Sequence, residues 1–145
     1  MCGLGNLLKA VAGGKQYDMN CQKGYGIVVE VAVPPFPYLA TNGKYNPKGL
    51  KIYFKERLTA NELDHIHFSE VAVCQNGKEE KEYAMVSTGG YVMCVTGTGK
   101  TVQKARDKAY SLTDKVIVPK MFYRNDIGLQ YIENDNKLLR EWGYL

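Results

Sequence analysis

Residues 86–101 run Val86-Ser87-Thr88-Gly89-Gly90-Tyr91-Val92-Met93-Cys94-Val95-Thr96-Gly97-Thr98-Gly99-Lys100-Thr101, and the fold can be worked out from here. The pair Gly89-Gly90 predicts a turn, because glycine adopts backbone conformations that other residues avoid. The apolar, β-branched run over 91–97 predicts a buried strand. Beyond it, apolar residues at helical spacing predict a helix over 101–110, with Thr98 or Thr101 as its N-cap.

Strand signals also precede the glycine turn. Residues 81–87 form a strand candidate that a tight turn at Asn76-Gly77 joins to residues 65–74. The segments 65–74, 81–87 and 91–97 follow one another along the chain, so they predict a three-stranded antiparallel meander at the centre of a sheet.

Further elements are predicted around this meander. A β-branched run over 24–33 predicts a buried strand that ends at Pro34-Pro35, and residues 50–54 predict a short strand. Other helical signals are apolar spacing over 4–11 with a stop at Gly13-Gly14, a cap at Thr59 with Glu62, and a terminal helix that packs Ile132, Leu138, Leu139 and Trp142. Together they predict an α+β fold, in which an antiparallel, partly barrel-like sheet carries one packed helix and a terminal helix.

The composition is that of a folded globular domain. The chain has 145 residues, of which 45% are hydrophobic and 23% are charged, and this suits one domain with one core. Its net charge of +4 is spread without a run of like charges, which argues against nucleic acid as a partner. No segment is apolar over the roughly 18–20 residues that span a bilayer, so we expect a cytoplasmic protein with no membrane partner.

Motifs for metal binding or thiol chemistry are weak. The four cysteines, Cys2, Cys21, Cys74 and Cys94, are too widely spaced for a Cys-x-x-Cys pair, and we expect reduced thiols. His65 and His67 fall on one face of a predicted strand, so they could approach one metal ion, with Cys74 or Glu70 as further ligands. Packing or surface histidines explain the same pattern more simply.

Two other motifs allow a binding role. Residues 97–101, Gly-Thr-Gly-Lys-Thr, resemble a phosphate-binding loop, but that motif also needs glycine where Cys94 stands, and a glycine turn followed by a helix cap accounts for them. Arg124-Asn125-Asp126 follows an aromatic triplet and precedes Ile127-Gly128. The arginine could bind an anion, or it could pair with the aspartate and hold a turn.

Two blocks resemble the C-terminal domain of the glycinamide ribonucleotide synthetases, the phosphoribosylamine-glycine ligases of the ATP-grasp superfamily. Residues 86–97 are similar to the family's strand-Gly-Gly-Arg-strand turn, and residues 121–128 to its closing Tyr-Arg-Arg-Asp-Ile-Gly. Between them, residues 105–110 resemble its Ala-Arg-x-x-Ala-Tyr helix. Upstream, residues 6–13 resemble the helix that leaves the ATP-grasp core and residues 24–38 resemble a Val-rich strand, so the resemblance covers about 6–128.

The chain departs from the family pattern at three places. Tyr91 stands in place of the arginine after Gly-Gly, Asn125 in place of the second arginine before the aspartate, and residues 67–71 blur the family's Phe-His-Ala-Gly-Thr strand. The two lost positive charges weaken any contact of this domain with a phosphate.

The resemblance implies a role in purine biosynthesis. The family joins glycine to 5-phosphoribosylamine with ATP, and its C-terminal domain packs on the ATP-grasp region and helps to close the substrate cleft. We therefore expect an accessory domain at 15–145, an exit helix from the ATP-grasp region at 1–14, and no catalytic or metal-binding residue. Gly89, Gly90, Arg124 and Asp126 match the family pattern, and we expect them to face the cleft or the docking surface.

The same resemblance implies where the cofactors and partners belong. ATP and Mg²⁺ are expected for the full-length ligase and no cofactor for this chain, which alone lacks the ATP-grasp catalytic core. The expected partner is the ATP-grasp portion, in cis or as a separate chain, and apolar surface could also drive self-association. The alternatives are a free-standing, non-catalytic binding or interaction module, a small nucleic-acid-binding protein, and a cysteine or metal enzyme.

Overall fold

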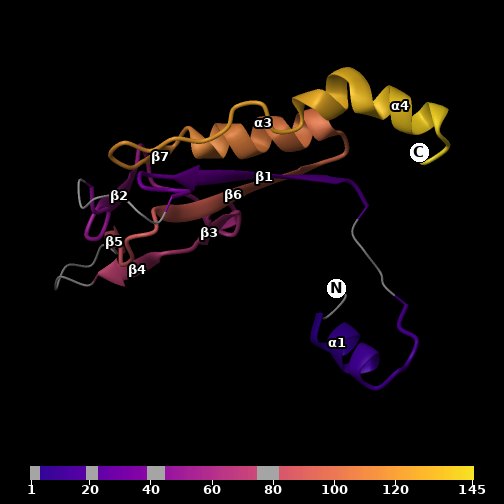
Figure 1. The fold of residues 1–145 in the computed structure, drawn as a ribbon, viewed down its shortest axis with the longest axis horizontal. Helices are drawn as coiled ribbons and strands as arrows, with labels where there is room; N and C mark the ends of the chain where they lie inside the picture. The colour runs from indigo at the N-terminus through magenta and orange to yellow at the C-terminus, as the bar shows by residue number, and fades with distance from the viewer. Residues whose placement is uncertain (1–3, 19–22, 39–44, 75–81) are drawn as a thin grey trace.

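The chain folds around two antiparallel sheets and the helix α3 (Figure 1). A computed structural model describes residues 4–18, 23–38, 45–74 and 82–145. The strands are β1 (Tyr25–Ala32), β2 (Lys51–Phe54), β3 (Ile66–Phe68), β4 (Val71–Cys74), β5 (Glu82–Met85), β6 (Tyr91–Gly99) and β7 (Val116–Ile117). The helices are α1 (Leu4–Ala12), α2 (Ala60–Leu63), α3 (Val102–Thr113), the π-helical segment η1 (Tyr131–Asp135) and α4 (Asn136–Glu141).

The strands form two open sheets with the orders β1-β6-β3 and β4-β5-β2-β7, and every pairing is antiparallel. The longest ladder joins β1 to β6, with Val29 opposite Val95 and Tyr25 opposite Gly99. Val29 and Val95 are fully buried, since they face the core that α3 covers. The predicted α+β class is confirmed, with α3 as the packed helix and α4 as the terminal one.

Helix α3 lies directly on β6 because two strand residues carry no side chain. A Cβ atom on Gly97 would lie 2.2 Å from the Ala105 oxygen and 2.5 Å from the Ala109 nitrogen. One on Gly99 would lie 2.7 Å from the Ala105 nitrogen. Ala105 and Ala109 are fully buried in this contact. The glycines that resemble a phosphate-binding loop therefore belong to the strand and serve helix packing.

The start of α3 follows the sequence-based prediction. Thr101 has extended backbone angles, and its Oγ1 accepts a hydrogen bond from the Lys104 nitrogen at 3.2 Å, so Thr101 is the N-cap. This bond satisfies one of the amide groups that the first turn of a helix leaves without an internal partner.

The predicted meander is wrong, because its first segment is divided between the two sheets. Residues 65–74 form β3, which pairs with β6, and β4, which pairs with β5. Strand β6 pairs with β1 and β3, and not with β5. The division falls at Glu70, whose nitrogen donates to the Tyr91 oxygen at 3.2 Å while its own oxygen accepts from the Val86 nitrogen at 2.9 Å. This backbone contributes to both sheets, an arrangement that no local sequence pattern reports.

The helices at the two ends of the chain, α1 and α4, have no buried residue. Helix α1 ends at Ala12 and is followed by Gly14, with φ of 62°, as the Gly13-Gly14 pair predicts, but it has no buried residue and lies apart from the sheets (Figure 1). The terminal helix exists, but its predicted packing is wrong, since Trp142 is 64% exposed and Ile132 is 36% exposed. In the described part of the chain no helix has the length and apolar character needed to cross a membrane.

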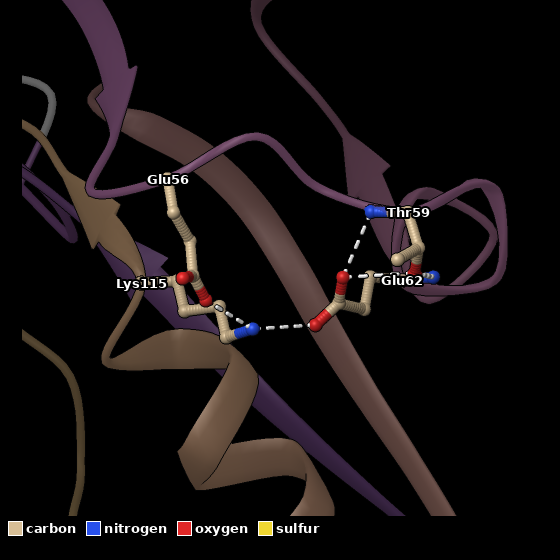
Figure 2. Close-up of polar contacts among 4 residues, drawn as sticks. All are labelled: Glu56, Thr59, Glu62 and Lys115. Atoms are coloured by element: carbon tan, nitrogen blue, oxygen red, sulfur yellow. Dashed lines mark hydrogen bonds and ion pairs between the residues drawn. The ribbon is translucent and has the colours of Figure 1, made fainter.

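Lys115, just after α3, ties that helix to the segment before β3 (Figure 2). Its Nζ lies 2.6 Å from Glu56 Oε1 and 2.6 Å from Glu62 Oε1. Glu62 also accepts from the Thr59 nitrogen at 2.8 Å, while Thr59 Oγ1 accepts from the Glu62 nitrogen at 3.2 Å. The capping box predicted at Thr59 is therefore confirmed, and it holds the carboxylate beside Lys115.

The Glu62–Lys115 pair predicts a pH-dependent stability. The hydrogen bond from Lys115 is the main cause that lowers the pKa of Glu62 from its ordinary 4.5 to about 2. The neighbouring carboxylates, Glu56 first, raise the pKa of Lys115. The pKa of Glu62 is lower in the folded state than in the unfolded state. The contribution of this carboxylate to folding stability is therefore complete above pH 4.5 and is lost as the pH falls toward 2.

Glu62→Gln isolates the contribution of the Glu62 charge to folding stability, because glutamine can also complete a capping box. We expect the variant to be less stable than the wild type at pH 7, and the difference to vanish near pH 2. Urea denaturation followed by circular dichroism at pH 7, 4 and 2 measures it. A difference that stays constant over this range would contradict the assignment of the pKa shift to Lys115.

Candidate functional site

The Gly89-Gly90 turn is held by close backbone contacts. Gly90 has φ of +85°, and a Cβ there would lie 2.2 Å from the Val33 oxygen. The Gly90 oxygen accepts a hydrogen bond from the Val33 nitrogen at 2.9 Å, and the Gly90 nitrogen donates one to Glu70 Oε2 at 3.1 Å. A Cβ on Gly89 would lie 2.5 Å from Glu70 Oε1. Gly90 is thus required by the junction between the sheets, whereas a Cβ on Gly89 would meet only the end of the flexible Glu70 side chain.

Tyr91 follows this turn at the position where the resembled family has arginine. Its hydroxyl lies 3.5 Å from Cys94 Sγ, and its ring packs edge-on against Phe36 at 5.6 Å between centroids. The hydrogen bond with Cys94 is the main cause, and burial the next, that raise the pKa of Tyr91 to about 12. Glu30 lies opposite Cys94 across the β1–β6 ladder, and its Oε1 is buried without a hydrogen-bond partner in the described structure. The Tyr91 side chain is therefore neutral at physiological pH.

The side chains of His65 and His67 both lie within hydrogen-bond distance of the Thr96 hydroxyl group. Thr96 Oγ1 lies 3.0 Å from His65 Nδ1 and 3.4 Å from His67 Nε2. Across the residues that the structure describes, His, Cys, Asp and Glu nowhere gather in a group of three or more that could hold a metal ion. The pair is thus a hydrogen-bonded surface cluster on β6 and β3.

A second cluster forms where residues 124–128, here called the 124–128 loop, lie along α3. The Tyr110 hydroxyl donates to the Arg124 oxygen at 2.6 Å and accepts from the Ile127 nitrogen at 3.2 Å. The Arg106 Nη2 atom donates to the Asn125 oxygen, and the guanidinium group lies 4.4 Å from the centroid of the Tyr110 ring. Two side chains of one helix therefore fix the backbone of the loop at three positions.

Both ends of this loop are also anchored. Before it, the Tyr123 hydroxyl donates to Asp114 Oδ1 at 3.1 Å, and burial together with this bond raises the pKa of Tyr123. At its end, Gly128 has φ of +85°, and a Cβ there would lie 2.9 Å from Ile27 Cδ1. The chain thus runs antiparallel to α3, from its C-terminal cap toward its first turn.

The Arg124 and Asp126 side chains form a bidentate ion pair on the outer side of the loop. Arg124 Nε lies 2.9 Å from Asp126 Oδ1, and Arg124 Nη2 lies 2.7 Å from Asp126 Oδ2. Each partner shifts the other, so the pKa of Asp126 is lowered and that of Arg124 is raised. The side chains remain 74% and 51% exposed. Of the two sequence-based alternatives, the geometry matches the pair that holds a turn.

A cavity of about 420 Å³ lies beside this pair. Its lining includes Arg124, Asp126, Gln130 and Glu133, which together offer amide and carboxylate groups to a polar ligand. The Gly89-Gly90 turn does not line it. The four residues singled out from the sequence are thus divided between two places, a sheet junction and a polar cavity over α3.

Comparison with known proteins now places the chain in a family. The model of the family described as "Phosphoribosylglycinamide synthetase, C domain" matches residues 43–130, which is more than half of the chain. The chain belongs to this family. The matched region contains both the sheet junction and the 124–128 loop.

The chain is also similar to proteins named phosphoribosylamine-glycine ligase. The phosphoribosylamine-glycine ligase of Thermotoga maritima is 32% identical over 123 residues, which are 85% of this chain and 26% of that protein. The ligase of Vibrio vulnificus is 35% identical over 75 residues, 52% of this chain and 18% of that protein. The crystal structure of the Thermotoga maritima ligase matches with a TM-score of 0.59 and 28% identity, over 86% of this chain and 27% of that one. The chain therefore spans about a quarter or less of the length of these relatives.

The family pattern gains a physical basis from these contacts. Arg106 and Tyr110 belong to the Ala-Arg-x-x-Ala-Tyr helix of the family, and they hold the closing block of the same family in place. Sequence reasoning placed both on a helix but gave them no role. The available signal was that a partly polar helix precedes a loop with many backbone groups to satisfy.

Tyr110→Phe tests how the 124–128 loop is held. The variant loses a donor and an acceptor at a half-buried position, so we expect the free energy of unfolding to fall by about 1–3 kcal/mol. Thermal or urea denaturation measures this loss. Tyr144→Phe is the matched control, since Tyr144 is 76% exposed. Equal stability of the two variants would show that Tyr110 does not anchor the loop.

Gly90→Ala tests the sheet junction. The positive φ and the contact with the Val33 oxygen should together cost at least about 2 kcal/mol of stability. Gly26→Ala serves as the control, because no atom lies within 4 Å of the added Cβ. We expect the control to stay within about 0.5 kcal/mol of the wild type in the same denaturation experiment. If Gly90→Ala matches the control, the close contact at the junction is not required.

Proposed function

We propose that this chain acts as the C-terminal accessory domain of a phosphoribosylamine-glycine ligase, which joins glycine to 5-phosphoribosylamine at the expense of ATP. The observation that carries the proposal is the attachment of the 124–128 loop to α3. Tyr110 and Arg106 form hydrogen bonds with backbone groups of Arg124, Asn125 and Ile127. Two segments that resemble the family pattern, the helix and the closing block, are therefore in direct contact. Such a rigid edge suits a surface that must dock in one orientation on another domain.

The chain's own contribution in this proposal is positioning. The exposed Arg124–Asp126 pair and the adjacent 420 Å³ cavity form a polar surface that would face the rest of the ligase. The Gly89-Gly90 turn contributes separately, at the junction between the two sheets. ATP and Mg²⁺ would bind the ATP-grasp portion, supplied in cis or as a separate chain.

The proposed boundary between the two portions lies near residue 15. Helix α1 has no buried residue, and Leu4, Leu8 and Val11 are between 59% and 66% exposed. An apolar stripe of this kind is usually covered by a partner surface. We therefore assign residues 1–14 to the exit helix from the ATP-grasp portion and residues 15–145 to the accessory domain.

A chimera tests the proposal directly. Residues 15–145 would replace the matching quarter of the Thermotoga maritima ligase, and ADP release would be measured with glycine and phosphoribosylamine. We expect the chimera to recover glycine-dependent ADP release that the truncated ligase lacks. The chimera with Tyr110→Phe should lose part of this gain if the 124–128 loop positions the domain, whereas Tyr144→Phe should retain it.

The opposite result would favour a non-catalytic binding module. Tyr91 is neutral and its hydroxyl is bonded to Cys94, so it cannot supply the charge that the family arginine provides. A chimera that folds, binds no sugar phosphate and releases no ADP would overturn the ligase proposal. In that case Tyr91→Arg should also fail to restore activity.

A further inference from the structure

Four lysines that are scattered in the sequence meet around one groove. They are Lys23, Lys100, Lys104 and Lys108, and they line a cavity of about 740 Å³ at the open end of the β1–β6 ladder. Figure 1 shows that β1 begins and β6 ends at the same end of this ladder, where the chain turns into α3. The sequence contains no basic run at any of these positions, so only the fold reveals the cluster.

Three glycines, Gly24, Gly26 and Gly99, are among the residues that line the groove. Gly24 has φ of +133°, and a Cβ there would lie 2.8 Å from the Gly99 oxygen, so this close crossing excludes other residues. Gly26 also lines the groove, and no atom lies within 4 Å of its Cβ position. A ligand could therefore approach the backbone directly while the lysine side chains surround it.

The groove lining carries four lysines and one carboxylate, so its positive charge is only partly offset. Lys51, Lys115 and Lys137 all form ion pairs with glutamates, whereas none is recorded for the four groove lysines in the described structure. One acidic residue lines the groove, Asp107, whose Oδ1 accepts a hydrogen bond from Gln103 Nε2 at 2.6 Å.

Gathering like charges in this way is unfavourable without an anion. Lys104 and Lys108 are four residues apart on α3, a spacing at which like charges repel. The first turn of α3 does not offset this, because the N-terminal end of a helix carries a partial positive charge. A cluster of like charges that forms no ion pair within the described residues suits a ligand of opposite charge.

We propose that this groove binds a chain of linked phosphates. The lysines come from three segments, one before β1, one in the turn after β6 and one on α3, and the cavity of about 740 Å³ that they surround has room for more than one phosphate group. Lysine is a point-charge phosphate binder, and two or three linked phosphates would engage the whole set. The ligand is either a free oligophosphate or the phosphate tail of a nucleotide. Tyr25, which is 38% exposed in the lining, offers a ring for a base. This inference is independent of the ligase activity.

Calorimetric titration of the full chain with sodium tripolyphosphate tests the proposal. We expect one site, and an affinity that falls steeply as the salt concentration rises. Lys104→Glu with Lys108→Glu should weaken binding by at least about tenfold, because each lost cation contact costs roughly a factor of five. Asp107→Asn should strengthen binding, since it removes the negative charge from the groove.

The matched control changes the same charge elsewhere. Lys48 and Lys55 are exposed residues that flank β2 and do not line the groove, so Lys48→Glu with Lys55→Glu should shift the affinity by less than about twofold. Thermal denaturation of each variant verifies that it is folded. An equal loss in the groove and control variants would overturn the proposal, because it would reflect net charge alone.

The source of the phosphates is resolved by further titrations. Tighter binding of ATP than of tripolyphosphate, reduced by Tyr25→Leu, would identify a nucleotide, whereas equal affinities would identify a free oligophosphate, and either result supports the groove. No binding of tripolyphosphate at low salt would overturn it. A short single-stranded oligonucleotide that binds far more tightly than both would also overturn it, in favour of a nucleic-acid surface.

Discussion

The close contact between α3 and β6 is the constraint on which the rest of the structure depends. It requires Gly97 and Gly99, because a Cβ at either position would overlap the helix backbone. On the helix side it requires small residues, and Ala105 and Ala109 meet the strand with no exposed surface. A helix held this closely acts as a rigid platform, since packed interiors leave little room for sliding.

Each outward-facing part of α3 then positions a different region. Tyr110 and Arg106 hold the 124–128 loop, and with it the exposed ion pair and its cavity. Lys115, just beyond the helix, joins it to the capping box at α2. Lys104 and Lys108 supply one wall of the basic groove. The 124–128 loop, the capping box and the basic groove are thus all attached to one element.

The local elements could be predicted from the sequence, because their signals are local. The N-cap at Thr101, the capping box at Thr59 and the proline stop after β1 each depend on residues a few positions apart. The α+β class and the family followed from such signals taken in order. A pair between Arg124 and Asp126 was one of two alternatives that the sequence left open, since the residues are two positions apart, and the structure has this pair.

The remaining features depend on contacts that are distant in sequence. The division of 65–74 between the two sheets follows from the backbone of Glu70, which bonds both Tyr91 and Val86. The groove is lined by residues as far apart in the sequence as Lys23 and Lys108. In the terminal segment, the apolar residues predicted a packed helix, but Trp142 is largely exposed. In each case the deciding partner was absent from the local pattern. In the proposed function Arg124 and Asp126 belong to the docking surface, whereas Gly89 and Gly90 hold the sheet junction.

Native-state amide hydrogen exchange tests most directly whether α3 is this platform. The Ile127 amide is bonded to the Tyr110 hydroxyl, and the Ala105 amide lies within the first turns of α3. With rising denaturant, the account predicts that both amides converge to the same opening free energy, because the loop and the helix open as one unit. If Ile127 instead exchanges through a separate opening of lower free energy while Ala105 stays protected, the loop is independent of α3 and the account is contradicted.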